Sequence, residues 1–143
     1  MAVPWRKTLH IEVPDLRRTA RVLSSSFSSF KARAVAERHL FGSHEAAWAA
    51  HLEGYSPRSL RVMLKRFGFK ALRVRCNSWR GTYNFELFAR KALAALSREA
   101  LAHAASDYLG SFLLDGSPSE LKLHEVWMEE YRRQVERSWA AGA

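Results

Sequence analysis

The stretch from Ser56 to Phe69 restricts the fold more than any other part of this sequence. Ser56-Pro57 is typical of a helix N-cap followed by the first helical position, and Gly68 stands where a left-handed C-cap is favoured. The apolar residues between them recur on one helical stripe: Leu60, Met63, Leu64 and Phe67. The pattern predicts an amphipathic helix over residues 57–67, which must bury that stripe against another layer of the protein.

Residues 8–13 alternate apolar and polar side chains, which predicts a strand near the start of the sequence. Pro14 ends this strand, because proline has no amide hydrogen to donate to a sheet ladder. Asp15 is well placed to cap a helix that begins near Leu16. The first predicted unit is therefore a strand, a Pro-Asp turn and a helix.

The remaining elements up to residue 91 follow from serine content and periodicity. A serine-rich break over 24–29 precedes a second helix over 30–40, and a short helix is expected over 45–52. Residues 70–76 and 83–89 predict two more strands. Because only a short polar loop over 77–81 joins them, they are expected to be antiparallel neighbours.

The sequence after residue 91 is helical in pattern. One or two helices are expected within residues 93–112, and Ser117-Pro118-Ser119-Glu120 has the form of a capping box with proline at the first helical position. It opens a long final helix with an apolar stripe at Leu123, Trp127, Tyr131, Val135 and Trp139. We therefore expect a domain portion over 1–91 and a helical extension over 92–143 packed on it.

Composition excludes several classes of protein. No apolar run reaches the ~18 residues that span a bilayer, and Cys76 has no partner for a disulfide within the chain. His39, His44 and His51 lie close in sequence but lack metal-ligand spacing. The sequence predicts a cytoplasmic protein without a membrane segment, a metal site or a glycine-rich phosphate loop.

A formal net charge of +9 leaves a nucleic-acid partner open. Basic residues gather on the 57–67 helix and the strand after it: Arg58, Arg61, Lys65, Arg66, Lys70, Arg73 and Arg75. A helix followed by a hairpin has the form of a winged helix, which would use residues 57–89 on nucleic acid. The alternative is that these charges coat a solvated helix face, and we favour it because the winged helix needs a tight helix-turn-helix that residues 42–55 do not suggest.

Several short motifs between residues 5 and 91 occur in a characteristic order. They are Trp5-Arg6, residues 9–16, Leu40-Phe41-Gly42, His51, Tyr55-Ser56, Ser59-Leu60, Met63-Leu64, Phe67-Gly68-Phe69 and Phe88-Ala89-Arg90-Lys91. In order and spacing they resemble the C-terminal half of small bacterial class I S-adenosylmethionine-dependent methyltransferases. The resemblance implies an α/β fold with part of a Rossmann-like sheet, in which one parallel strand over residues 9–13 lies beside the antiparallel pair, with helices flanking it.

The resemblance also marks what the sequence lacks. The family holds S-adenosylmethionine with an acidic-Gly-x-Gly-x-Gly turn after its first strand, and this chain has no matching positions. No cofactor-binding residue is therefore assigned, and the chain alone is expected neither to bind S-adenosylmethionine tightly nor to turn over. It is interpreted as a methyltransferase fragment that needs an N-terminal half.

The substrate side of the family does have counterparts here. His51 and Tyr55 match a His-x-x-Gly-aromatic element, which makes His51 a candidate general base and Tyr55 a candidate contact to the methyl acceptor, a small molecule or glycan. Asp15 matches the residue at the lip of the cleft. The exposed edge of strand 9–13 is expected to pair with the N-terminal half or with a second copy.

Overall fold

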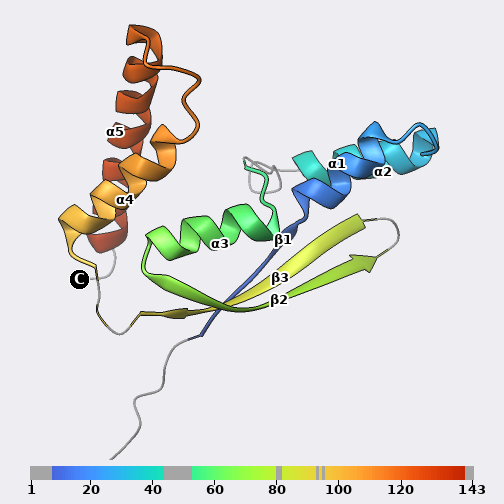
Figure 1. Cartoon of the computed structure of the whole chain (residues 1–143), viewed down its shortest axis with the longest axis horizontal. Coiled ribbons are helices and arrows are strands. Elements are labelled where there is room, and N and C mark those ends of the chain that lie inside the picture. Colours follow the sequence, from blue (N-terminus) through green and yellow to red (C-terminus); the bar gives the residue numbers. More distant parts are fainter. Residues whose placement is uncertain (1–7, 44–52, 80–81, 93, 95, 141–143) are drawn as a thin grey trace, which may run out of the picture. The chain divides into compact units, whose positions relative to one another are not determined.

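A computed structural model of the 143-residue chain describes residues 8–43, 53–79, 82–92, 94 and 96–140. The elements are β1 (Thr8–Pro14), α1 (Leu16–Ser24), α2 (Phe30–Phe41), α3 (Pro57–Arg66), β2 (Phe69–Trp79), β3 (Thr82–Lys91), α4 (Arg98–Gly110) and α5 (Pro118–Ala140) (Figure 1). The chain divides into two compact units. The first comprises Met1–Lys65 and Phe69–Ala92, and the second comprises Arg66–Gly68 and Leu93–Ala143.

The first unit is built on a three-stranded sheet with the order β1-β3-β2. β3 lies in the middle and is antiparallel to both neighbours, with Leu87 opposite Ile11 of β1 and Val74 of β2. The antiparallel pair and the position of β1 beside it agree with the sequence prediction.

The prediction of one parallel strand needs correction. β1 and β2 point the same way, because each is antiparallel to β3. However, β3, the second strand of the hairpin, lies between β1 and β2. Every strand pairing in the described sheet is therefore antiparallel. The fold is an α/β arrangement with an open antiparallel sheet.

The core of the first unit lies between α3 and one face of the sheet. Phe85, Leu87 and Ala89 alternate along β3 and are fully buried. Leu60 and Leu64 of α3 pack against them, as the apolar stripe predicts, and Figure 1 shows α3 running along the sheet. Burying a large apolar side chain of this kind contributes ~1.5–3 kcal/mol, so this layer is the main source of the unit's stability.

The opposite face of the sheet is polar. His10 Nε2 lies 3.1 Å from Glu86 Oε2, and the His10 ring stacks on Phe88 with a centroid separation of 4.4 Å. The side-chain amides of Asn77 and Asn84 both donate to Glu12 Oε1, at 3.1 and 3.2 Å. Because successive side chains of β1 point to opposite faces of the sheet, its apolar residues lie on the buried face and its polar residues on the other.

Two of the predicted caps are formed: Asp15 caps α1, and Gly68 has a φ of 80° after α3, as expected for a left-handed residue. Ser29, predicted only as the end of a serine-rich break, caps α2. α3 ends at Arg66 rather than at residue 67. The short helix predicted over 45–52 lies outside the described residues.

The hairpin is longer than predicted. Residues 77–79 were expected to be loop, but Ser78 pairs with Tyr83 and Trp79 pairs with Thr82. Polar residues are common at the exposed end of a hairpin. Pairing with β3 gives the backbone N–H and C=O groups of residues 77–79 protein partners, whereas in a loop they would bond to water. Cross-strand pairing therefore outweighs local composition here.

The second unit consists of α4 and α5 with the short segment 66–68. Ser97 caps α4, which begins at Arg98, later than the predicted start at 93. Ala104, Ala105 and Met128 form its buried apolar centre. In the described residues, neither α5 nor any other helix is long and apolar enough to cross a membrane.

The capping box predicted at Ser117 is not formed. The Glu120 carboxylate accepts a hydrogen bond from the backbone N–H of Leu114 at 2.9 Å, instead of reaching back to Ser117. The Ser117 N–H donates to Asp115 Oδ1 at 2.8 Å. In a capping box the Ser117 N–H would donate to Glu120, but here an Asx turn at Asp115 uses that N–H.

Candidate functional site

The carboxyl end of β1 fixes Asp15 firmly. Pro14 closes the strand, and the backbone N–H of Asp15 donates to the carbonyl of Tyr83 at 2.8 Å. The Asp15 carboxylate accepts from the backbone N–H of Arg18 at 3.1 Å, which caps α1. Only 2% of Asp15 is exposed. Its first role is therefore structural, and it holds the start of α1 against the sheet.

Asp15 and Tyr55, both predicted as substrate-side residues, come together through the backbone. They form an isolated parallel bridge, and the N–H of Leu16 donates to the carbonyl of Tyr55 at 2.9 Å. The Tyr55 hydroxyl donates to the Glu53 carboxylate. The bridge brings the beginning of α3 next to the beginning of α1, whereas His51, the predicted base, lies outside the described residues.

A cavity of about 620 Å³ lies where these two helices begin. Its charged lining is Asp15, Arg17, Arg18 and Arg21 from the β1–α1 segment and Arg58 and Arg61 from α3. We call it the arginine cavity. Among the described residues, five guanidinium groups face one carboxylate, which already serves as a helix cap, so this lining is strongly cationic.

One of the five arginines is anchored and four are exposed. Arg18 Nη1 donates to the carbonyl of Asn77 at 3.0 Å, and its guanidinium carbon lies 4.5 Å from the centre of the Tyr83 ring. The guanidinium groups of the other four have no ion-pair partner among the described residues: Arg17, Arg21, Arg58 and Arg61. The cavity therefore offers unneutralised positive charge.

Sequence reasoning found only half of this site. The basic run of the 57–67 helix includes Arg58 and Arg61, but the sequence pattern assigns no function to the arginines of α1. The available signal was Arg17-Arg18-x-x-Arg21 directly after a strand, together with Arg58-x-x-Arg61 at another helix start. Their convergence depends on the Asp15–Tyr55 bridge, which no local pattern indicates.

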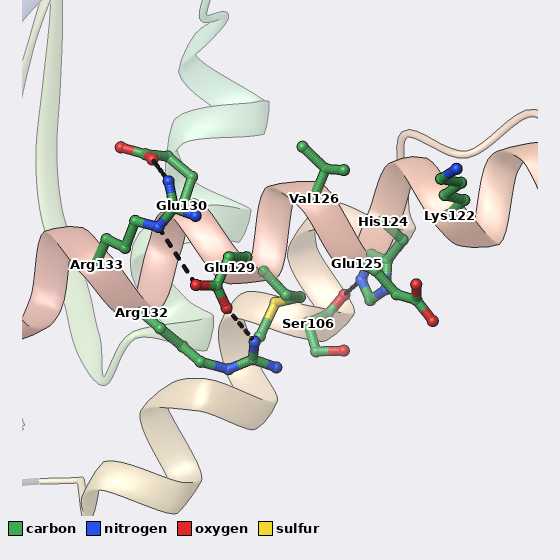
Figure 2. Close-up of a pocket in the computed structure, with 10 residues that line it drawn as sticks. Ser106, Lys122, His124, Glu125, Val126, Glu129, Glu130, Arg132 and Arg133 are labelled. Atoms are coloured by element: carbon green, nitrogen blue, oxygen red, sulfur yellow. Dashed lines mark hydrogen bonds and ion pairs between the residues drawn. The ribbon is translucent and has the colours of Figure 1, made fainter.

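A second hollow, of about 700 Å³, lies in the second unit and has a different character. Figure 2 shows that the glutamates and arginines at positions 129–133 bind one another. Glu129 pairs with Arg132 at 3.1 Å and with Arg133 at 3.3 Å, and Glu130 lies 4.0 Å from Arg133. Because these charges are neutralised internally, the hollow attracts a charged ligand weakly compared with the arginine cavity.

The described residues contain no group of three or more His, Cys, Asp or Glu side chains arranged to hold a metal ion. Cys76 is an exposed free thiol. Comparison with known protein families, curated proteins and solved structures gives no match to this chain.

Proposed function

We propose that this chain is the C-terminal portion of a class I S-adenosylmethionine-dependent methyltransferase domain and supplies the acceptor side of the active site. The observation that carries the proposal is the strand order β1-β3-β2. The resemblance requires the strand that ends in Pro14-Asp15 to lie beside the hairpin, and β1 pairs with β3 in this way. The helix ending at Gly68 before β2 is a further point in its favour.

The described residues do not suit the binding of S-adenosylmethionine itself. The cofactor carries a sulfonium cation, and the arginine cavity beside Asp15 would repel it. The sequence also lacks a Gly-x-Gly-x-Gly turn that would hold the cofactor. The methyl donor must therefore be held by an N-terminal half, and the chain's own contribution is the acceptor side, with Asp15 and Tyr55 as candidate acceptor contacts and His51 as candidate base.

The free edge of β1 provides a place for that half to pair. Asp15 directs its N–H toward β3, and because the direction alternates along a strand, His10 and Glu12 direct their N–H and C=O groups away from β3. No described strand pairs with this edge at those two residues. An added strand would therefore find an open hydrogen-bonding ladder.

The proposal is tested by complementation. The chain is mixed with the cofactor-binding half of a small class I methyltransferase, and S-adenosylmethionine binding is measured by calorimetry alongside methyl transfer to a panel of small-molecule and glycan acceptors. The chain alone should not bind S-adenosylmethionine at micromolar concentration, whereas the mixture should. Micromolar binding by the chain alone, or no association with the added half, would contradict the proposal.

A pair of variants at His10 tests the role of the free edge. His10→Pro removes an outward N–H without removing a β1–β3 hydrogen bond, since proline is tolerated where the N–H faces away from the sheet. His10→Ala loses the same contacts to Glu86 and Phe88 but keeps the N–H. Association should fall with His10→Pro and persist with His10→Ala.

A second candidate function is nucleic-acid binding by α3 and the hairpin. Arg58, Arg61 and Lys65 are exposed on α3, and Trp79 near the end of the hairpin is 69% exposed. Binding of a DNA duplex that weakens steeply with salt and is lost in Arg58→Gln/Arg61→Gln/Lys65→Gln would favour it. Retention of that binding in Arg17→Gln/Arg21→Gln would assign it to the α3 face rather than to the arginine cavity.

A further inference from the structure

The arginine cavity goes beyond both candidate functions, because neither uses Arg17, Arg18 and Arg21. We propose that this cavity is a binding site for a phosphate group, carried by a phosphate ester or a polyphosphate. The inference depends on neither the methyltransferase proposal nor the winged-helix alternative. It depends on the charge, composition and anchoring of the cavity.

Charge is the first argument. Five guanidinium groups share one cavity, and the only carboxylate that the described residues contribute to its lining, Asp15, is 2% exposed and already accepts the N–H of Arg18. Like charges gathered in this way repel one another, and a bound multivalent anion would relieve that repulsion. Surface arginines that serve only solubility need not converge from two helices.

The type of cation is the second argument. Among the described residues, all the basic side chains that line the cavity are arginines, and none is a lysine. The planar guanidinium group donates two parallel hydrogen bonds to phosphate oxygens, which makes arginine the preferred partner where phosphate geometry is recognised. Of the common biological anions, phosphate groups and polyphosphates match this donor set best in both charge and number of acceptors.

Anchoring is the third argument. The bond from Leu16 to Tyr55 joins the two helix starts, so the arginines of α1 and α3 are held near one another before any ligand arrives. Arg18 is further fixed by Asn77 and Tyr83. Such preorganisation lowers the conformational entropy lost on binding. Ser56 at the start of α3 accepts from the N–H of Ser59, so we rest the site on the guanidinium groups and not on the helix end.

The size of the cavity allows more than inorganic phosphate. Its volume of about 620 Å³ lies within the range of sites for small organic ligands. A smaller adjoining hollow of about 310 Å³ shares Arg18 and Arg21 and adds Ser25, Ser28 and Tyr83. The phosphate group could belong to a small metabolite or to a nucleic-acid backbone, and the experiment separates these sources.

Binding is measured by calorimetry with the full chain, using pyrophosphate, a small sugar phosphate and a short single-stranded DNA as probes at two salt concentrations. We compare Arg17→Gln/Arg21→Gln and Arg58→Gln/Arg61→Gln with the control Lys31→Gln/Arg38→Gln. The control removes the same charge from exposed basic residues on α2, which lie outside the cavity and outside the 57–89 segment. Thermal denaturation checks that all variants remain folded.

Each cavity double variant should lose about tenfold or more in affinity, as expected for the loss of charge-assisted hydrogen bonds, and the control should lose less than about twofold. Strong binding of pyrophosphate or the sugar phosphate without a gain for DNA would indicate a small phosphorylated ligand. Stronger DNA binding that is lost in the cavity variants would indicate backbone phosphates. Binding of no probe, or an equal loss in the control, would overturn the proposal and leave the complementation test unaffected.

Discussion

Asp15 and Tyr55 lie side by side in a single parallel β-bridge. The backbone N–H of Leu16 donates to the carbonyl of Tyr55 at 2.9 Å and stabilises this bridge. This contact joins the end of β1 to the start of α3, forty positions further along the chain. It sets the spacing of the two helix starts whose arginines form the cavity. The relative position of these two groups of arginines therefore depends on a backbone contact between distant residues.

Removal of the Asp15 side chain should destabilise the first unit. Asp15→Ala deletes the buried cap of α1 and should lower the free energy of unfolding by ~1–2 kcal/mol, whereas Asp15→Asn keeps an acceptor oxygen and should change it by less than about 0.5 kcal/mol. Urea denaturation measures both. Ser29→Ala, which removes the exposed cap of α2, is the matched control and should cost less than Asp15→Ala. Equal effects of the two alanine variants would show that burial of Asp15 adds nothing to its cap.

The hydroxyl of Thr19 offers a stabilising substitution. Thr19 is 1% exposed, and its Oγ1 has no hydrogen-bond partner among the residues that the structure describes. Thr19→Val keeps the shape and removes the unsatisfied oxygen, so we expect the free energy of unfolding to stay the same or rise by up to about 1 kcal/mol. Thr19→Ala leaves a void and should lower it. A loss of stability in Thr19→Val, measured by the same denaturation assay, would mean that the hydroxyl has a partner in solution.

Gly68 should resist substitution. Its φ of 80° disfavours any side chain, and a Cβ there would lie 3.3 Å from Leu96 Cδ1. Gly68→Ala should therefore cost ~1–2 kcal/mol in the free energy of unfolding. Gly116 is the control, because a Cβ built there meets nothing within 4 Å. Gly116→Ala should be close to neutral, and a similar cost at both positions would contradict this account.

The turn before α5 should shift the pKa of the Asp115 carboxyl, which can be measured. Hydrogen bonds from the side chain and backbone of Ser117 lower the pKa of the Asp115 carboxyl below its ordinary value. A pKa lowered by folding stabilises the folded state above the unfolded pKa, and this contribution is lost as pH falls through the lowered value. Ser117→Ala should move the Asp115 pKa upward, and titration followed by NMR measures it. Glu99, whose pKa is lowered by its own backbone and by Ser97, should not respond.

Local chemistry explains which features the sequence predicts well. Asp15 caps a helix because proline closes the strand before it, and Gly68 is left-handed because no other residue adopts that conformation as easily. The apolar stripe at Leu60 and Leu64 meets β3 as its spacing requires. Each of these features is decided within about one turn of helix or one strand.

The features that the sequence misses depend on distant partners. Trp79 is in a strand because Thr82 pairs with it, and Glu120 leaves its capping box because Leu114 offers another donor. The arginine cavity requires residues that lie about forty positions apart to meet at one backbone bridge. Composition gave the net charge of +9 but not its concentration at that place.

The central position of β3 has a consequence for the synthesis of this protein. Ile11 finds its partner in Leu87, and β1 has no bonded neighbour in the described sheet except β3. As the chain leaves the ribosome, the first strand must wait until almost the whole first unit has been translated. Local helices can form early, but β1 can pair only after β3 has been synthesised. Such pairing between distant segments makes the assembly of the sheet slow for its size. During that interval the open strand is exposed to other chains, including other copies of itself.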